Sequence, residues 1–193
     1  MKTTLSLSYL NGNLQFMTPN QPQPRPILRF PLSWVDILLE LGAISGLLCC
    51  VVIAFLVWPD LRDRVPIHFG ISGKPDAWGA KVIILILPVV AFILNTVFII
   101  ISRYPHTFNY PVKITPENAR KQYLLALSLL KWLKLEIIWL FTLIFWQQMQ
   151  VALGAKETLS LGLMISSFLV ITTTVVIYLI QSYQNRKITT DSD

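Results

Sequence analysis

The chain has 193 residues, of which 54% are hydrophobic and 13% are charged, and its formal net charge is +6. Soluble domains carry about 25% charged residues, so this composition, with its apolar residues gathered in blocks, excludes an ordinary soluble protein and indicates a membrane protein. The positive charge is not a nucleic-acid signal, because the basic residues flank the apolar blocks, where they orient a membrane protein and meet anionic headgroups. We therefore expect the lipid bilayer, and no nucleic acid, as a partner.

The first thirty residues differ in character from the rest. Residues 1–30 are polar and rich in proline, and no apolar run among them is long enough for a secretory signal. We expect this segment to be disordered, and both Met1 and Met17 are candidate start residues. Residues 31–185 are expected to form a membrane domain, and residues 186–193 a polar tail.

Four apolar blocks follow the N-terminal segment, at roughly residues 36–58, 82–102, 124–146 and 159–181. Each is about twenty residues or longer, the length that crosses about 30 Å of hydrocarbon as a helix. The predicted fold class is therefore an all-α membrane protein with four transmembrane helices and a structured extracytoplasmic loop between helices 1 and 2.

Several polar or special residues within these blocks have structural explanations. Ser33 is expected to cap the first helix, with Asp36 in its first turn. Pro88 is expected to kink the second helix or free a backbone carbonyl, and Asn95 to make an interhelical hydrogen bond. Small packing roles, or bonds back to their own helix, are expected for Cys49, Cys50, Ser166, Ser167, Thr172, Thr173 and Thr174.

The third block carries unusual charges. Lys131 and Lys134 share one helix face, and Glu136 lies on another. In one interpretation both lysines reach the membrane interface, and the helix begins in the preceding loop with Thr115 as its cap. In the other, Lys134 is buried against Glu40 of the first helix as an ion pair. We favour the first.

Basic residues predict the orientation, because cytoplasmic loops carry an excess of them. Four spans place both termini and the 103–123 loop on one side, with nine basic residues against five on the other. We therefore expect both termini in the cytoplasm and the 59–81 loop outside. The nine are Lys2, Arg25, Arg29, Arg103, Lys113, Arg120, Lys121, Arg186 and Lys187, and the five are Arg62, Arg64, Lys74, Lys81 and Lys156.

The 59–81 loop is the segment richest in turn signals. Val65 precedes a proline and is expected to be extended, and the segment Lys74-Pro75-Asp76 predicts a turn. Trp78 is expected at headgroup level just before the second helix, with Lys81 beside it. Such a polar loop between apolar blocks is the expected working surface of a small membrane protein.

His68 is the strongest candidate for a functional residue in this loop, because histidine changes charge near neutral pH and often binds metals. Asp60, Asp63 and Asp76 are possible partners by residue type, whereas His106 lies across the membrane. We read His68 first as a structural, hydrogen-bonded residue, with a binding contact and a metal or catalytic role as alternatives. One histidine with one or two aspartates is a small ligand set for zinc, so the metal is left unknown. We expect no cofactor, and no nucleophile constellation or nucleotide-binding motif is present.

The 103–123 loop alternates aromatic, proline and basic residues. We read it first as a set of interfacial anchors that meet lipid headgroups. A docking surface for a cytoplasmic partner is the alternative.

The motif Val65-Pro66-Ile67-His68-Phe69, followed by Gly73-Lys74-Pro75-Asp76-Ala77-Trp78-Gly79-Ala80-Lys81, resembles the bacterial membrane family called domain of unknown function 1648. The resemblance covers roughly residues 40–150, with Pro88 matching a proline in the following helix, and its loop motif is more specific than its helices. It implies a bacterial inner-membrane protein. The binding residues predicted on this basis are His68, Phe69, Gly73, Asp76, Trp78, Gly79 and Lys81.

SdpI-type immunity proteins carry such a domain first, and they protect a bacterium from its own secreted protein toxin. The signature of their second domain is not expected in these 193 residues, where a single ordinary span follows, and Trp58-Pro59 stands where the pattern has Leu-Pro. The leading hypothesis is therefore a non-enzymatic protein that binds a membrane or secreted protein through its outer loop, in an immunity-like or sensory role. An assembly or stability factor for a larger membrane complex is the second hypothesis, and a membrane enzyme or metal site at the His68 loop is the third. The oligomeric state is left open.

Overall fold

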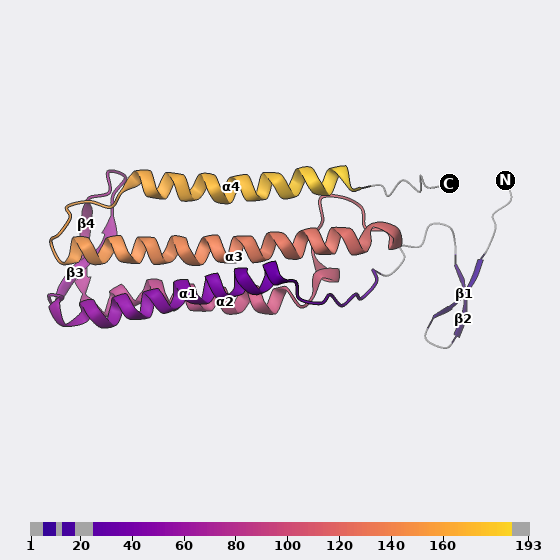
Figure 1. The fold of residues 1–193 in the computed structure, drawn as a ribbon, viewed down its shortest axis with the longest axis horizontal. Helices are drawn as coiled ribbons and strands as arrows, with labels where there is room; N and C mark the ends of the chain where they lie inside the picture. The colour runs from indigo at the N-terminus through magenta and orange to yellow at the C-terminus, as the bar shows by residue number, and fades with distance from the viewer. Residues whose placement is uncertain (1–5, 11–12, 18–24, 187–193) are drawn as a thin grey trace.

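Four long helices build the molecule. The computed structural model describes residues 6–10, 13–17 and 25–186 of the chain. Helices α1 (Trp34–Val57), α2 (Ile86–Ile101), α3 (Pro116–Ala152) and α4 (Leu161–Gln184) run alongside one another as an elongated bundle (Figure 1). The predicted polar tail lies outside the described residues from residue 187 onward.

Two short strands fall within the segment predicted to be disordered. Strands β1 (Ser6–Leu10) and β2 (Asn13–Met17) pair antiparallel, with Ser6 opposite Met17. The remainder of residues 1–24 lies outside the described part of the chain, so disorder of the segment stays a prediction.

Helices α1 and α3 begin at the residues that the sequence predicts. Ser33 caps α1, where its Oγ accepts a hydrogen bond from the Asp36 amide at 3.2 Å and its own amide donates to Asp36 Oδ2 at 2.8 Å. Thr115 caps α3 in the same reciprocal way with Asn118. Each capping box satisfies backbone donors that a helix N-terminus leaves without partners.

Pro88 lies in the first turn of α2, where the lack of an amide proton costs little. The preceding residues form a 3-10 helix, η2 (Lys81–Leu85). The predicted distortion near Pro88 therefore takes the form of a change of helix type at the start of α2.

Three helical segments are long and apolar enough to cross a bilayer, judged by length and composition: Trp34–Asp60, Lys81–Ile101 and Leu161–Gln184. Large apolar side chains are exposed along them, among them Phe55, Phe92 and Phe168. Exposed apolar surface on this scale suits lipid rather than water. The protein is thus an integral membrane protein with at least these three apolar helices.

Helix α3 differs because many of its polar side chains are buried within the protein. It lies between the α1–α2 pair and α4 (Figure 1) and contacts all three. Polar groups on a central helix find partners within the bundle, where they act as interhelical links. The buried polar residues of α3 are Asn118, Gln122, Lys134, Thr142, Gln147 and Gln148.

Small residues of α1 let its backbone approach α3 closely. A Cβ atom at Gly46 would lie 3.0 Å from Ile138 Cγ2. The Gly46 carbonyl accepts a hydrogen bond from Thr142 Oγ1 at 3.1 Å, and the Gly42 carbonyl accepts one from Trp139 Nε1 at 2.9 Å. Cys50 continues this stripe as a small buried residue, as expected.

The favoured interpretation of Lys134 is wrong. Its side chain is 4% exposed, and its ammonium group pairs with Glu40 of α1. One turn away, Lys131 Nζ lies 2.7 Å from Asp36 Oδ1. A lysine on the α1-facing side of α3 is surrounded by protein, so pairing within the bundle replaces the route to the interface.

Glu136 lies on the other side of α3, as its spacing predicts, and accepts a hydrogen bond from Thr174 of α4 at 2.5 Å. Farther along, Gln122 Nε2 donates to the carbonyls of Ser182 and Asn185 at 3.0 and 3.1 Å. Four α4 hydroxyls bond back to their own helix as predicted, at Ser166, Ser167, Thr172 and Thr173.

Asn95 is buried, but its Oδ1 atom has no hydrogen-bond partner among the residues that the structure describes. The predicted interhelical hydrogen bond is therefore not made by this oxygen. Asn95 shares the buried face of α2 with Ala91, which packs in the mid-bundle cluster with Ala43 and Ile138.

Candidate functional site

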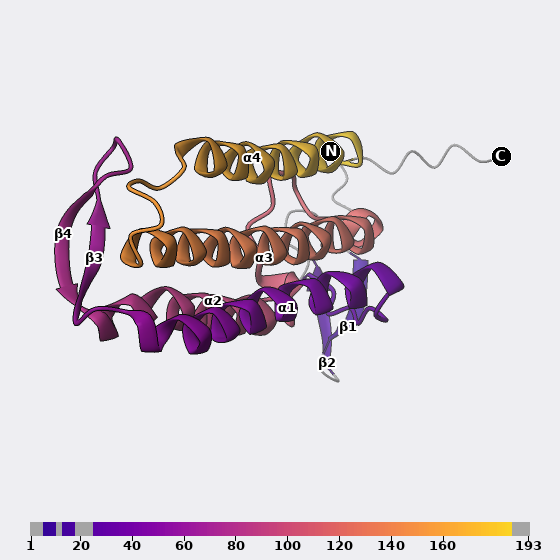
Figure 2. The ribbon, with the colours of Figure 1, turned by 60° about the vertical axis from the view of Figure 1, so that its left-hand side comes forward.

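The predicted outer loop folds as a β-hairpin that lies across one end of the bundle (Figure 2). Strand β3 (Arg64–Phe69) pairs antiparallel with β4 (Pro75–Ala80), and a register shift follows Pro66. The all-α fold class did not include these strands. Alternating residues around a glycine turn favour a hairpin, and the predicted turn at Lys74-Pro75-Asp76 lies slightly earlier, because β4 already begins at Pro75.

One face of the hairpin packs on the bundle. Val65 is fully buried, in a cluster that includes Ile84, Phe145 and Met149. The Pro66 carbonyl accepts a hydrogen bond from Gln148 Nε2 of α3 at 2.9 Å. Strand, 3-10 helix and α3 therefore share one core at this end of the molecule.

The tip of the hairpin is tied to the loop between α3 and α4. Gly73 has a φ of 76°, and a Cβ atom at this position would lie 2.6 Å from the Leu159 carbonyl oxygen. The Gly73 carbonyl accepts a hydrogen bond from the Leu159 amide at 2.9 Å. Gln147 Oε1 in turn accepts a hydrogen bond from the Ser160 amide at 2.5 Å. Gly73 is thus a positioning residue of the hairpin.

The other face of the hairpin carries the polar residues. His68 Nδ1 and Asp76 Oδ1 are 2.5 Å apart, and their side chains are 70% and 51% exposed. Of the three aspartates considered for His68, Asp76 is the one that lies beside it. The pair joins β3 to β4 and remains open to solvent, so it can meet a ligand or a partner from outside.

Trp78 lies on the same outer side of β4 and is half exposed. It lines a shallow depression with Asp76, Arg62 and Arg64. Arg64 also donates a hydrogen bond to the Trp78 carbonyl at 3.2 Å. At the tip, Ile71 is almost fully exposed. The outer face of the hairpin, defined here as Arg62, Arg64, His68, Ile71, Asp76 and Trp78, therefore combines charge with exposed apolar surface.

Four of the predicted binding residues lie apart from this outer face: Gly73, which is held against Leu159, and Gly79, Phe69 and Lys81. A Cβ atom at Gly79 would lie 2.9 Å from Ile67 Cδ1, so this glycine serves close packing. Phe69 is half-buried where β3 ends. Lys81 is the first residue of η2, and its Nζ atom lies 5.0 Å from the ring centre of Trp58.

A metal centre finds little support in this arrangement. Over the described ranges 6–10, 13–17 and 25–186, no group of three or more histidine, cysteine, aspartate or glutamate side chains could hold a metal ion. His68 and Asp76 supply two ligands, whereas structural zinc takes four and catalytic zinc three from protein.

The opposite end of the bundle holds the 103–123 loop. Arg25 donates hydrogen bonds to the carbonyls of His106 and Phe108 at 3.2 and 2.6 Å, and its guanidinium lies 5.6 Å from the Tyr110 ring centre. Tyr110 stacks on Tyr123 at 5.5 Å, and burial raises the pKa of the Tyr110 phenol well above its usual range. Tyr110 and Tyr123 therefore pack against each other within the protein. The role of the loop as a set of lipid anchors stays a prediction.

Residues 46–92 match the family model described as Domain of unknown function (DUF1648). The match runs from the middle of α1 through the hairpin into α2, a narrower range than residues 40–150, and over this segment it confirms the predicted resemblance. A protein of Archaeoglobus fulgidus, described as an uncharacterized protein, is 38% identical over 64 residues, which is 29% of this chain and 35% of that protein. No solved structure matches the chain significantly.

The sequence analysis missed the glutamines that hold the hairpin and its neighbouring loop. Gln147 and Gln148 are buried near the end of α3. Gln147 binds the loop between α3 and α4, and Gln148 binds the hairpin. Adjacent glutamines at the end of an apolar block were the available signal. They interrupt the apolar pattern where hydrogen-bond partners from a loop are needed.

Proposed function

We propose that this protein is a non-enzymatic, four-span membrane protein that binds a partner protein through the outer face of the β3–β4 hairpin. The observation that carries the proposal is the division of the hairpin into two faces. One face is fixed to the bundle by Val65, Gly73 and Pro66, while the other leaves Trp78 and the His68–Asp76 pair exposed. A rigid support beneath an exposed aromatic residue is a favourable basis for recognition.

The proposal treats α3 as the fourth span. Its 37 residues exceed the length that crosses a bilayer, and its polar groups face neighbouring helices rather than lipid. With four spans, both termini lie on the side richer in basic residues, in the cytoplasm of a bacterial inner membrane, and the hairpin lies outside. This topology makes the outer face reachable by secreted proteins or by other envelope proteins.

The chemistry of the outer face suggests what the partner presents. Ile71 and Trp78 offer apolar anchors, and Arg62 and Arg64 offer positive charge beside them. A complementary partner carries an apolar patch bordered by acidic residues. The resemblance to SdpI-type proteins supports a secreted protein toxin as one such partner, with an immunity-like or sensory role for this protein.

The experiment compares variants of the full-length protein in native membranes. Trp78→Ala and His68→Ala are photo-crosslinked alongside wild type and purified in mild detergent, with Lys74→Ala as the control. Lys74 is exposed in the same hairpin but lies outside the outer face. We expect Trp78→Ala to reduce the crosslinked partner about tenfold or more, since central aromatic anchors are typically worth over 1.4 kcal/mol, and Lys74→Ala to leave it unchanged. Equal loss in all variants, or in none, contradicts the proposal.

A further inference from the structure

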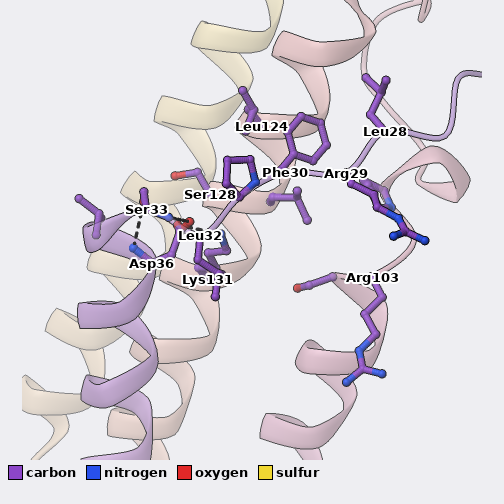
Figure 3. A pocket seen from close by; sticks show the side chains of 15 residues that line it. Leu28, Arg29, Phe30, Leu32, Ser33, Asp36, Arg103, Leu124, Ser128 and Lys131 are labelled. Atoms are coloured by element: carbon purple, nitrogen blue, oxygen red, sulfur yellow. Dashed lines mark hydrogen bonds and ion pairs between the residues drawn. The ribbon is translucent and has the colours of Figure 1, made fainter.

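A second candidate site lies at the end of the bundle opposite the hairpin. A cavity of about 630 Å³ opens between the 28–36 segment, the end of α2 and α3. Figure 3 shows its lining, with Arg29 and Arg103 on one side and the Ser33–Asp36–Lys131 group on the other. Three separate parts of the chain therefore contribute to one hollow.

The charged side chains that line this cavity differ in whether they are paired. Asp36 is occupied by Lys131 at 2.7 Å and by the Ser33 amide at 2.8 Å. Across residues 25–186, by contrast, the side chains of Arg29 and Arg103 make no ion pair and no hydrogen bond. The two arginines thus give the lining of the cavity a net positive charge. Guanidinium groups bind phosphate well because their donors match its oxygens.

The remaining wall of the cavity is largely apolar. Leu28, Phe30 and Leu32 come from the segment before α1, and Leu124 and Leu127 come from α3. Arg103 follows the C-terminus of α2, one of the apolar helices, and Asp36 lies in the first turn of α1. The cavity therefore sits where two membrane-crossing segments end, which is the depth of lipid headgroups.

We propose that this cavity binds an anionic phospholipid, with the phosphate on Arg29 and Arg103 and an acyl chain along the leucine-rich wall. Basic pockets between membrane helices bind anionic headgroups by this combination of charge and apolar contact. The site is independent of the hairpin and of its proposed partner. A lipid bound in this cavity would contact the segment before α1, the end of α2 and α3 at once.

The test uses full-length protein in nanodiscs that contain equal amounts of phosphatidylglycerol and phosphatidylcholine, followed by native mass spectrometry of retained lipid. The site variant is Arg29→Gln/Arg103→Gln. The control is Arg120→Gln/Lys121→Gln, which removes the same charge from exposed positions near the start of α3 that do not line the cavity. We expect the site variant to lose preference for phosphatidylglycerol by about tenfold or more, because each basic residue near a headgroup contributes about 1 kcal/mol, and the control to keep it.

Two further measurements keep the outcome interpretable. Circular dichroism and size-exclusion profiles check that the variants are folded, and the preference of the wild type should fall as salt concentration rises. Inorganic phosphate and glycerol phosphate are added separately to test for a free phosphate as the occupant. Arginine-dependent thermal stabilisation by either of them, without retained phosphatidylglycerol, overturns the lipid assignment. Equal loss of preference in site and control variants overturns the site itself.

Discussion

Gly73 and Gly154 have the same φ of 76° but different surroundings. At Gly73 an added Cβ atom meets the Leu159 carbonyl oxygen at 2.6 Å, whereas at Gly154 nothing lies within 4 Å. We expect Gly154→Ala to cost about 1 kcal/mol from backbone strain alone, and Gly73→Ala about 3 kcal/mol because it also displaces the tip of the hairpin. Thermal unfolding in detergent measures both, and equal losses would show that the hairpin tip is not held against Leu159.

Lys134 and Glu40 form the pair whose ammonium group is most deeply buried. Glu40→Gln leaves a nearly inaccessible cation without its counter-charge, and we expect a loss of about 3 kcal/mol or more in the free energy of unfolding. The double variant Glu40→Leu/Lys134→Met should recover most of this loss, since well-packed apolar residues often replace a buried pair at no cost. Additive losses in a double-mutant cycle would contradict the pairing.

The spacing of these charges held a signal that the sequence analysis did not use. Asp36 and Glu40 are four residues apart on α1, and Lys131 and Lys134 are three apart on α3, so each pair shares one helix face. The sequence shows one acidic and one basic helix face, but it does not show which helices are neighbours. That α1 packs against α3 follows only from the tertiary structure. From the sequence alone, it was therefore equally reasonable to place the two lysines at the membrane interface.

At the level of single elements, α1 packs closely against α3. Gly46 is buried, and a Cβ atom there would lie 3.0 Å from Ile138 Cγ2, whereas one at Gly162 would meet only Ser160 Oγ at 3.9 Å. We expect Gly46→Val to destabilise the bundle by about 1–3 kcal/mol through overpacking, and Gly162→Ala to be neutral or slightly stabilising. Unfolding curves in the same detergent compare the two, and an unperturbed Gly46→Val would place α1 farther from α3.

The hairpin depends on α3 through Gln148. Replacing Gln148 with Leu removes the hydrogen bond to the Pro66 carbonyl and leaves a buried acceptor without a partner. We expect faster amide hydrogen exchange in β3 and β4, with exchange in the middle of α3 unchanged. Gln150→Leu is the matched control on the same helix end, since within the described part of the chain the hydrogen bonds of Gln150 with the following loop are made by its backbone carbonyl. Equal exchange in both variants would mean that the hairpin is held by its apolar face alone.

Helix starts were predictable because capping chemistry is local. Ser33 and Thr115 were identified from their neighbours in sequence, and both make the expected contacts. The strands β3 and β4 were not identified, although the loop was expected to be structured. A short hairpin is marginal by itself, and its stability here comes from Phe145, Gln148 and Leu159, which lie far along the chain.

At the scale of the whole molecule, an integral membrane protein follows from composition alone, but its number of spans does not. Helix α3 is only weakly apolar because it carries many polar side chains, of which several are buried against α1, α4, the hairpin and the neighbouring loop. In the proposed four-span topology, a hydropathy scale that treats every residue as facing lipid misses such a central helix. The hairpin and the loop between α3 and α4 lie at one end of the bundle, and the loop between α2 and α3 lies at the other (Figure 1).

In the proposed topology, the hairpin faces outward from a four-span bundle. Single cysteines at Ser72, Thr107 and Lys156, each exposed, test it directly in a Cys49→Ala/Cys50→Ala background. Intact cells are treated with a membrane-impermeant maleimide, and permeabilised cells serve as the control. We predict labelling at positions 72 and 156 in intact cells, and at position 107 only after permeabilisation. If position 156 is labelled only after permeabilisation, as expected for position 107, then α3 does not cross the membrane. If position 107 alone is labelled in intact cells, then the hairpin lies inside.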